Sequence, residues 1–406
     1  MPARICCLDL DTFFVSVERL LDPSLVGKPV VVGAAPGSRG VVTAASYEVR
    51  ALGVRAGMSA AEARRLAPDA VFVPTRHGAY GGYAKSVRAI LERYTPDVQT
   101  ASIDEFFLDF RGCESLWRRP SDVSDDAAIV RVVGEMRAAI QAEVGLPASA
   151  GIGAARAIAK IASALAKPAG TRFVAEGSEH ELVAALPVRR YPGIGPVAEA
   201  RLVEAGVRTL GALLTLPPGR LRAQFGGLAD AVRAGITPAP GRGLGRDRPA
   251  FREHDAPGEA VGSISNERTF RSDLGVREVD QELVALVERV GWRARQRQAR
   301  AGTVTVKLKY ADFVVVSRSR SCPPTSDEAA LLAVARELVR DAWGRALRVR
   351  LVGVALSGLV GPDTQLDLPF ARARPAPAAA IDAVRARFGY DAIRLGATGT
   401  GGDWSA

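Results

Sequence analysis

Residues 101–110 read ASIDEFFLDF. Isoleucine, phenylalanine and leucine dominate this run, and an apolar run with bulky aromatic residues is typical of a buried strand. Two adjacent carboxylates, Asp104 and Glu105, interrupt it. Burial of unpaired carboxylates is strongly unfavourable, so such groups usually have a cationic partner, a raised pKa or a metal ion. The function of the segment depends on which of these three applies.

The composition narrows the choice of partners. The chain has 406 residues, enough for two to four domains, and its hydrophobic content of 48% allows well-formed cores. A formal net charge of +10 favours nucleic acid or an anionic membrane as partner, although an arginine excess can also reflect coding bias.

The four cysteines show no CxxC spacing and indicate reduced thiols. Asp9 and Asp11 interrupt the first apolar stretch, which argues against a signal peptide, and no run reaches the length of a membrane span. We expect a soluble cytoplasmic protein.

The first 165 residues mix strands and helices. Buried strands are expected at residues 5–10, 29–33 and 97–110. Helical spacing is found at residues 59–67, 79–93, 127–143 and 154–166. Ser59 and Glu62 form a capping-box start for the first of these helices, and Pro168 ends the last one.

The rest of the chain divides at a linker. Residues 168–235 read as short helices separated by proline and glycine, and residues 238–260 are rich in proline, glycine and arginine, as linkers are. A separate α+β domain is then expected, with strands at 262–271, 303–317 and 347–360 and helices at 276–298 and 327–343. Residues 371–380 suggest a disordered tether, followed by a short helix at 380–388.

Strand geometry limits how the acidic residues can meet. Asp104 and Glu105 reach one site only if a turn or bulge separates them, because neighbouring strand residues point to opposite faces. Asp9 and Asp11 share a face, so either could join that site. Three carboxylates within about 4 Å repel by roughly 4 kcal/mol per pair at an effective dielectric of about 20. Mg²⁺ removes this repulsion, and two ions about 3.5–4 Å apart suit displacement at phosphorus. The alternative is that these acids form salt bridges with arginine.

Three motifs occur in the order and spacing of one known family. They are LDLDTFFVSVE (8–18), VVTAASYEVRALGVRAGM (41–58) and SIDEFFLD (102–109). Together they resemble the Y-family translesion DNA polymerases of the DNA polymerase IV type, and the resemblance runs from residue 5 to about residue 360.

The resemblance implies an α+β multidomain fold, the right-hand polymerase architecture. The implied domains are a palm (1–10 and 76–167), fingers (11–75), a helical thumb with a helix-hairpin-helix (168–237), a linker (238–260) and a C-terminal α+β little finger (261–360). Residues 361–406 would carry a clamp-binding motif and a flexible tail.

In this family the carboxylates that match Asp9, Asp104 and Glu105 hold two Mg²⁺ ions, with the backbone carbonyl of Leu10 as a further ligand. Asp11 would then be a supporting residue. The family's usual SIDEAYLD reads SIDEFFLD here, so Phe107 replaces a tyrosine. Phenylalanine loses only a hydroxyl, and we expect activity to remain.

The triphosphate would be held by three residues. Tyr47 and Arg50 are three apart and share a helical face, from which a hydroxyl and a guanidinium can bind phosphate oxygens. The family positions that match Tyr47, Arg50 and Lys167 contact the nucleotide. Lys167 has an alternative reading as a cation at a helix C-terminus, and Lys160 is a weaker candidate.

Phe13 and Phe14 follow the first carboxylates and are included among the nucleotide-binding residues. Packing in the core is the simple explanation for at least one of them. By resemblance, Phe14 is the steric gate, whose ring leaves no room for a ribose 2′-hydroxyl.

Two regions are candidates for contact with DNA. Residues 191–206, YPGIGPVAEARLVEAG, resemble a helix-hairpin-helix in which Gly193 and Gly195 open a helix whose backbone N–H groups suit a phosphate. Arg318 and Arg320 alternate with serines on one strand face, and with Arg268 they are candidates for phosphate contacts in the little finger. A charged edge strand is the alternative explanation.

The motif QLDLPF (365–370) resembles the peptide that replication proteins insert into the bacterial sliding clamp. Its anchors would be Gln365, Leu368 and Phe370. The alternative is that these residues end a strand.

The sequence therefore predicts an error-prone, template-directed DNA polymerase that acts as a monomer on primer-template DNA and dNTPs, with Mg²⁺ and without proofreading. Two other functions fit less well. A catalytically silent accessory protein that bridges DNA and the clamp would lose acidic ligands, and all three are present. A metal-dependent nuclease would not need Tyr47, Arg50 and Phe14.

Overall fold

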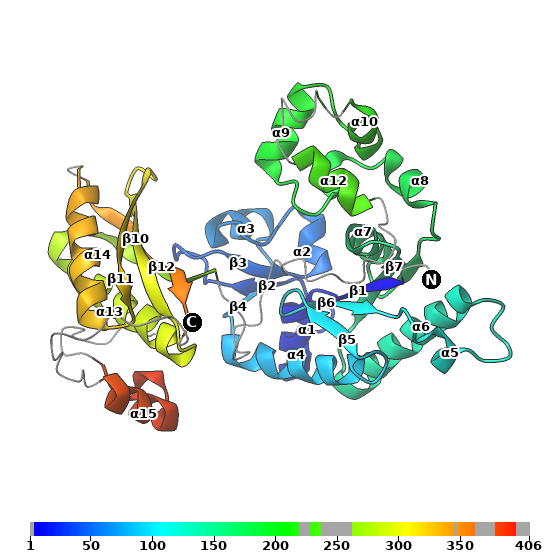
Figure 1. The fold of residues 1–406 in the computed structure, drawn as a ribbon, viewed down its shortest axis with the longest axis horizontal. Helices are drawn as coiled ribbons and strands as arrows, with labels where there is room; N and C mark the ends of the chain where they lie inside the picture. The colour runs from blue at the N-terminus through cyan, green and yellow to red at the C-terminus, as the bar shows by residue number, and fades with distance from the viewer. Residues whose placement is uncertain are drawn as a thin grey trace. The chain divides into compact units, whose positions relative to one another are not determined.

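The computed structural model describes residues 4–217, 219, 228–236, 262–344, 347–361 and 378–394. The chain divides into two compact units, and the break between Glu253 and His254 lies within the linker expected from the sequence. The short segment Gly37–Gly40 is grouped with the second unit. The expected linker itself lies outside the described residues. Figure 1 shows the elements of both units.

A five-stranded sheet forms the palm of the first unit, in the order β5-β6-β1-β7-β8 (Figure 1). Its strands are β5 (Asp97–Thr100), β6 (Glu105–Asp109), β1 (Ile5–Leu10), β7 (Ala148–Gly153) and β8 (Thr171–Phe173). The central strand β1 is antiparallel to both β6 and β7. Because β8 pairs with β7, the sheet extends past residue 167, where the sequence predicted the end of the palm.

Helices cover both faces of this sheet. The helices on one face are α1 (Phe13–Leu21), α4 (His77–Leu91) and α6 (Asp125–Val144), and they share one core with Cys6, Leu8 and Leu10 of β1. Helix α7 (Arg156–Ala166) covers the opposite face, where Ile5, Cys7 and Phe107 pack against Ala159. The alternation along β1 therefore directs Asp9 to the α7 face.

A small three-stranded sheet in the order β3-β2-β4 forms the expected fingers. Its elements are β2 (Val30–Gly33), β3 (Val42–Ala45), β4 (Val71–Val73), α2 (Tyr47–Ala51) and α3 (Ala60–Leu66). Ser59 caps α3 as predicted, since its hydroxyl accepts a hydrogen bond from the Glu62 N–H at 3.2 Å. The 3₁₀ turn η1 (Pro23–Leu25) precedes β2, and α5 (Glu114–Trp117) precedes α6.

Short helices form the expected thumb. They are α8 (Glu179–Ala184), η2 (Val188–Arg190), α9 (Pro196–Glu204), α10 (Leu210–Thr215) and α12 (Leu228–Ile236). Their core also takes in Ile158 and Ile161 of α7, so α7 packs on the palm with one side and on the thumb with another. The predicted pattern of short helical pieces is confirmed.

The second unit is an antiparallel sheet in the order β11-β10-β12-β9, covered on one face by helices (Figure 1). Its elements are β9 (Ser263–Leu274), α13 (Val276–Gln296), β10 (Arg300–Tyr310), β11 (Val315–Thr325), α14 (Glu328–Ala342) and β12 (Val349–Val360). The prediction of one strand over residues 303–317 is wrong, because β10 and β11 are two strands of a hairpin. The Asp312 side chain accepts from the Val314 N–H at 3.1 Å, and Phe313 has φ 68°, which closes the turn between them.

The segment beyond the second unit's sheet contains an ordered helix. Helix α15 (Ala378–Phe388) confirms the short helix predicted at residues 380–388. The helix and the turn η3 (Tyr390–Ala392) contact α13, so the flexible tail expected within residues 361–406 does not include residues 378–394. Arg295 of α13 binds Asp382 of α15 with bonds of 2.6 and 2.9 Å, and the rings of Trp292 and Tyr390 are 4.9 Å apart. The docking of this helix on α13 was not predicted, because the buried contacts of α15 are made by charged residues.

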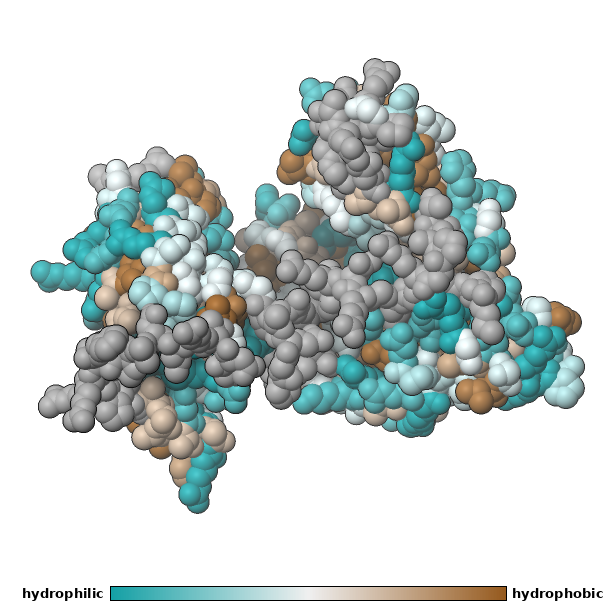
Figure 2. Space-filling model, viewed as in Figure 1, coloured by the Kyte–Doolittle hydropathy of each residue, from teal (hydrophilic) through white to brown (hydrophobic). Residues whose placement is uncertain are grey.

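On the face seen in Figure 2, many of the coloured residues are hydrophilic, and the apolar residues lie in small separate groups. Among the described residues, no helix is long and apolar enough to cross a membrane.

Candidate active site

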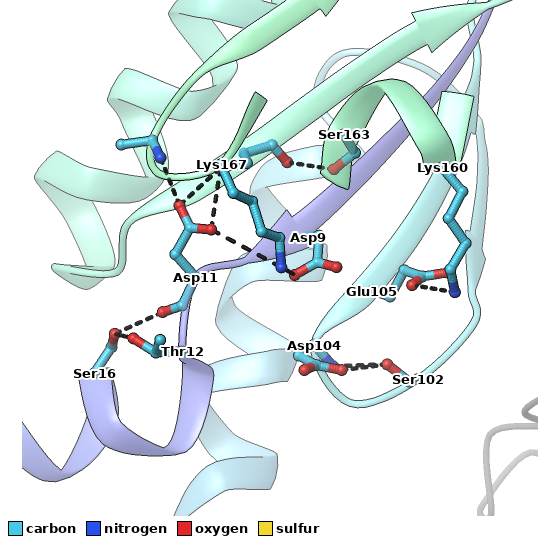
Figure 3. Close-up of polar contacts among 12 residues, drawn as sticks. Asp9, Asp11, Thr12, Ser16, Ser102, Asp104, Glu105, Lys160, Ser163 and Lys167 are labelled. Atoms are coloured by element: carbon cyan, nitrogen blue, oxygen red, sulfur yellow. Dashed lines mark hydrogen bonds and ion pairs between the residues drawn. The ribbon is translucent and has the colours of Figure 1, made fainter. Parts of the chain in front are cut away.

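Three carboxylates gather at one end of the palm sheet (Figure 3). Asp9 and Glu105 are direct partners in the β1–β6 ladder, so their side chains leave the sheet on the same face. Asp104 lies in the turn between β5 and β6, and its carbonyl accepts from the Leu10 N–H at 2.9 Å. The turn that the sequence required between Asp104 and Glu105 is therefore present.

Each carboxylate has a hydrogen-bonding partner, and two of these partners are lysines. Lys167 Nζ lies 2.5 Å from Asp9 Oδ1, and Lys160 Nζ lies 2.6 Å from Glu105 Oε2. The Ser102 hydroxyl donates to Asp104. Figure 3 shows both lysines reaching the carboxylates from the α7 side. Salt bridges with arginine were the alternative to a metal site in the sequence analysis, whereas the cations found here are lysines of α7 and its C-cap.

Burial alters the proton affinity of these groups. Burial raises the pKa of the Asp9 carboxyl to about 6, although Lys167 acts in the opposite direction. The pKa of Lys160 is also raised: burial lowers it, but the hydrogen bond and the charge of Glu105 outweigh that effect. The site therefore concentrates negative charge and stabilises cations next to it.

The donor atoms fit a hard divalent cation. Among the described residues, no group of three or more histidine, cysteine, aspartate or glutamate side chains is placed to hold a metal ion. The ammonium groups of Lys160 and Lys167 are paired with two of the carboxylates. Asp9, Asp104 and Glu105, with the carbonyl of Leu10, supply the oxygen ligands that Mg²⁺ prefers. Mg²⁺ would take over charge neutralisation that the lysines now provide.

The structure separates Asp9 from Asp11, which strand alternation alone left equivalent. Asp11 follows the end of β1 and is buried, and both of its carboxylate oxygens accept hydrogen bonds from Ser149. Further donors to Asp11 are the Ala169 N–H and the Tyr47 hydroxyl. Since protein donors already satisfy Asp11, Asp9 is the better candidate for a ligand.

The predicted triphosphate contacts lie beside the carboxylates. Tyr47 begins α2, and its hydroxyl donates to Asp11 Oδ1 at 3.1 Å. Burial raises the pKa of the Tyr47 hydroxyl, and the negative charge of Asp11 adds to this. The Arg50 guanidinium lies 5.4 Å from the centre of the Tyr47 ring, and Arg50 Nε donates to the Ala45 carbonyl at 2.8 Å. Lys167 is the C-cap of α7, as its alternative explanation requires, and it also pairs with Asp9. Its contact with the triphosphate stays a prediction.

The two phenylalanines have different surroundings. Phe13 is 3% exposed in the palm core, whereas Phe14 is only partly buried. The Phe14 ring stacks on Tyr80, with centroids 4.1 Å apart and an interplanar angle of 14°. The Tyr80 hydroxyl donates to buried Glu18 at 2.7 Å, which fixes the ring behind Phe14. The sequence analysis missed Tyr80 and Glu18, since no local spacing connects residues 62 positions apart.

The comparisons with known proteins agree with this geometry. Residues 8–164 match the impB/mucB/samB family, and residues 261–368 match the C-terminal domain of that family. A DNA polymerase IV of Dehalococcoides mccartyi is 34% identical over 399 residues, which is 97% of each chain. The chain belongs to the Y family of DNA polymerases. It is therefore a DNA-directed DNA polymerase of the translesion type.

Solved structures of Y-family polymerases share the fold. A Y-family DNA polymerase chimera, Dbh-Dpo4(243-245)-Dbh, is similar with a TM-score of 0.74 and 23% identity, covering 88% of this chain and 99% of the chimera. An insertion ternary complex of Dbh DNA polymerase has a TM-score of 0.57 and 22% identity, covering 88% of this chain and 99% of that one. The expected right-hand architecture is confirmed.

In this Y-family polymerase the predicted helix-hairpin-helix glycines precede α9. Gly195 is the N-cap of α9 and makes no side-chain cap, and Pro196 is the first helical residue. Gly193 has φ 100°, which favours glycine, and a Cβ added at either glycine would meet open space. The turn is therefore accessible, as a phosphate contact through backbone N–H groups requires.

The three arginines proposed for DNA contact in this polymerase lie on the helix-covered side of the second unit's sheet. Arg318 and Arg320 share a face, as predicted, and it is the face from which Val316 and Cys322 pack against the core. Arg320 pairs with Glu337 and Asp341 of α14, at 3.1 Å for the latter, and Arg268 pairs with Glu282 of α13 at 2.8 Å. Their contact with DNA remains a prediction.

The opposite face of that sheet carries small polar side chains. They are Ser263, Ser265, Thr269, Thr303, Thr305, Ser317, Ser319 and Ser321, together with Lys309 and the ion pair of Lys307 with Glu267 at 2.8 Å. The Thr305 and Ser319 hydroxyl oxygens are 2.9 Å apart, within hydrogen-bonding distance. The predicted clamp residues Gln365, Leu368 and Phe370 lie outside the described residues.

Proposed function

We propose that the chain adds deoxynucleotides to a primer by two-Mg²⁺ nucleotidyl transfer. The observation that carries this proposal is the convergence of Asp9, Asp104 and Glu105 at one end of the palm sheet, with Lys160 and Lys167 beside them. In the reaction, the primer 3′-hydroxyl loses its proton to solvent water, and its oxygen forms a bond to the α-phosphorus of the dNTP. The bond from that phosphorus to the bridging oxygen breaks, and pyrophosphate leaves with both electrons of the broken bond.

The side chains of the site have distinct roles in this proposal. Asp9, Asp104 and Glu105, with the Leu10 carbonyl, hold the metal ions. Bound Mg²⁺ lowers the pKa of the primer hydroxyl and neutralises the charge that develops on the leaving pyrophosphate. No carboxylate of the site is needed as a general base, since all three act as ligands. Lys160 Nζ lies 2.9 and 2.6 Å from the two Glu105 oxygens and orients this carboxylate.

Tyr47, Arg50 and Lys167 hold the triphosphate in this proposal. The Arg50 guanidinium is a planar donor suited to phosphate oxygens, and the Lys167 ammonium exchanges Asp9 for a phosphate when metal neutralises the carboxylate. The Phe14 ring, supported by Tyr80, excludes a ribose 2′-hydroxyl.

Contact with primer-template DNA would be through the sugar-phosphate backbone. The accessible turn at Gly193 and Gly195 suits one phosphate. The small hydroxyl-rich face of the second unit's sheet lets a duplex approach closely, and Lys309 supplies positive charge there. The ammonium of Lys307 on the same face is paired with Glu267 at 2.8 Å. Binding should weaken steeply with salt, because phosphate contacts release counterions.

Three finer features belong to the same proposal. The chain acts as a monomer, it has no proofreading activity, and the segment QLDLPF binds a sliding clamp through Gln365, Leu368 and Phe370. Their support is the resemblance of the sequence to the family. A mismatched primer incubated without dNTPs should stay intact. Replacement of Gln365, Leu368 and Phe370 by alanine should abolish clamp binding and leave primer extension without a clamp unchanged.

Primer extension by wild type and Asp104→Ala tests the catalytic proposal. The wild type should lengthen a labelled primer in the presence of Mg²⁺, and Asp104→Ala should not. Asp97→Ala is the matched control, since Asp97 lies at the far end of the same sheet and pairs in register with Asp109. A wild type that binds DNA without extending it would favour the silent accessory protein. A primer that shortens would favour the nuclease.

A further inference from the structure

The Asp11 carboxylate is satisfied by donors from three separate segments. Both Asp11 oxygens accept from the Ser149 hydroxyl, at 3.0 and 2.8 Å, and Oδ2 accepts from the Ala169 N–H at 2.7 Å. Oδ1 accepts from the Tyr47 hydroxyl at 3.1 Å. Ser149 belongs to β7, Ala169 to the turn after α7, and Tyr47 to α2. One carboxylate therefore joins the palm sheet, the helix that carries the lysines and the fingers.

The shortest of these hydrogen bonds, from the Ala169 N–H at 2.7 Å, holds the turn after Lys167. Ala169 has φ 47°, a left-handed conformation that is unfavourable for alanine and persists only when its surroundings impose it. The Ala169 N–H is bound by Asp11, and its carbonyl accepts from the Arg137 guanidinium. Lys167, two residues before, has its Nζ 4.0 Å from Asp11 Oδ1 and bound to Asp9 (Figure 3).

The contact with Tyr47 is of a different kind. A phenol has one proton, and in this structure that proton is donated to Asp11. A phosphate oxygen that binds the Tyr47 hydroxyl as an acceptor must take the same proton. Asp11 then keeps its bonds to Ser149 and Ala169, so the turn stays fixed while Tyr47 changes partner.

We propose that Asp11 is a positioning residue that fixes the turn after Lys167 to the end of β1 and holds the Tyr47 hydroxyl until a phosphate takes its proton. This inference rests on the proposed function of Tyr47 and Lys167 as triphosphate contacts. It assigns Asp11 to nucleotide binding, and it assigns Asp9, two residues earlier, to the metal.

Asp11→Asn tests this role, because asparagine keeps the size of the side chain but replaces one acceptor oxygen with an NH₂ group. That NH₂ group would face a hydrogen-bond donor, so at least one of the present hydrogen bonds would be lost. We expect the KM for dNTP to rise about tenfold, because the variant loses roughly one hydrogen bond to a charged group. The kcat should change by less than about threefold. The Mg²⁺ affinity of the nucleotide-free protein, measured by calorimetry, should stay within about twofold of wild type. Asp9→Asn is the matched comparison and should lower kcat and Mg²⁺ affinity.

The Lys167→Met background separates positioning from a general structural effect. If Asp11 acts through the turn that carries Lys167, the effect of Asp11→Asn on KM should shrink severalfold once Lys167 is absent. An equal effect in both backgrounds, or a fall in Mg²⁺ affinity with Asp11→Asn, would overturn the inference. A wild type that does not extend primers would refute the proposed function instead, and that result is obtained before any variant is compared.

Discussion

The docking of α15 on α13 depends on a buried ion pair whose removal should have a large, localised effect. The side chains of Arg385 and Glu288 are 0% and 2% exposed, and the guanidinium donates to the Glu288 carboxylate. Arg385 also donates to the Ile393 carbonyl at 3.0 Å, and its guanidinium lies 4.5 Å from the centre of the Tyr390 ring. A single side chain thus connects α15, η3 and α13.

We predict that Arg385→Met releases α15. Removing one member of a buried ion pair destabilises proteins by about 3–5 kcal/mol, because the remaining charge loses its compensation. The loss of stability measured at α15 cannot exceed the free energy with which α15 docks on α13. Once the helix is undocked, water reaches Glu288 and its charge is no longer buried. Hydrogen exchange of the full-length protein measures this directly. The α15 amides should exchange roughly 10²- to 10³-fold faster, while those of the palm sheet stay unchanged.

Two variants make this test decisive. Arg387→Met changes an exposed arginine two residues away on the same helix and should alter α15 exchange by less than about twofold. The double variant Arg385→Met with Glu288→Leu removes both charges and should recover most of the protection, because apolar groups can replace a buried pair. Protection of α15 that survives Arg385→Met would refute the reasoning. If the α15 amides exchange as fast in the double variant as in Arg385→Met, packing and not charge holds the helix.

Three further predictions concern the active site. Phe14→Ala should incorporate ribonucleotides far more readily in primer extension, and unchanged sugar selection would contradict the gate. Burial raises the pKa of Asp9 to about 6, so protons should compete with Mg²⁺ for this carboxylate below that pH. The Mg²⁺ affinity measured by calorimetry should therefore fall between about pH 7.5 and 5.5. A constant affinity would argue against Asp9 as a ligand. Gly151→Ala places a Cβ 2.1 Å from the Ala159 carbonyl oxygen of α7, so it should cost about 1–3 kcal/mol of unfolding free energy and reduce kcat. Gly134→Ala, which meets no atom within 4 Å in α6, should lower neither, and equal behaviour of the two variants would contradict the role of close α7 packing.

The sequence predicted the elements that place the carboxylates, and the reasons are local. Strand alternation and an apolar run located β1 and β6, and two adjacent acids in that run required the turn that places Asp104 before Glu105. The helix limits followed from Ser59 as a cap and Pro168 as a stop. These signals act within a few residues, so a single sequence contains them.

The parts that the sequence could not predict depend on contacts between distant segments. The β10–β11 turn contains neither glycine nor proline and is closed by Asp312 and Phe313, so 303–317 resembled one strand. Alternation showed that Arg318 and Arg320 share a face but not which face the helices cover. The sequence predicted a short helix at residues 380–388 but not its docking on α13, because its buried anchor, Arg385, belongs to a residue type that is seldom buried.

The two aspartates of β1's end show how a ligand differs from a structural acid. Asp9 is held by one lysine side chain, and the side chains of Lys167 and Asp9 are 23% and 22% exposed. An ion pair that water reaches contributes little net stability, so exchanging it for a metal and a phosphate has a small energetic penalty. Asp11 is bound by a backbone N–H and a buried hydroxyl, and loss of those bonds would leave buried donors unsatisfied. Both aspartates lie at the end of β1. The hydrogen-bond donors that α7 and β7 place next to each aspartate decide which carboxylate can exchange a protein partner for a metal ion.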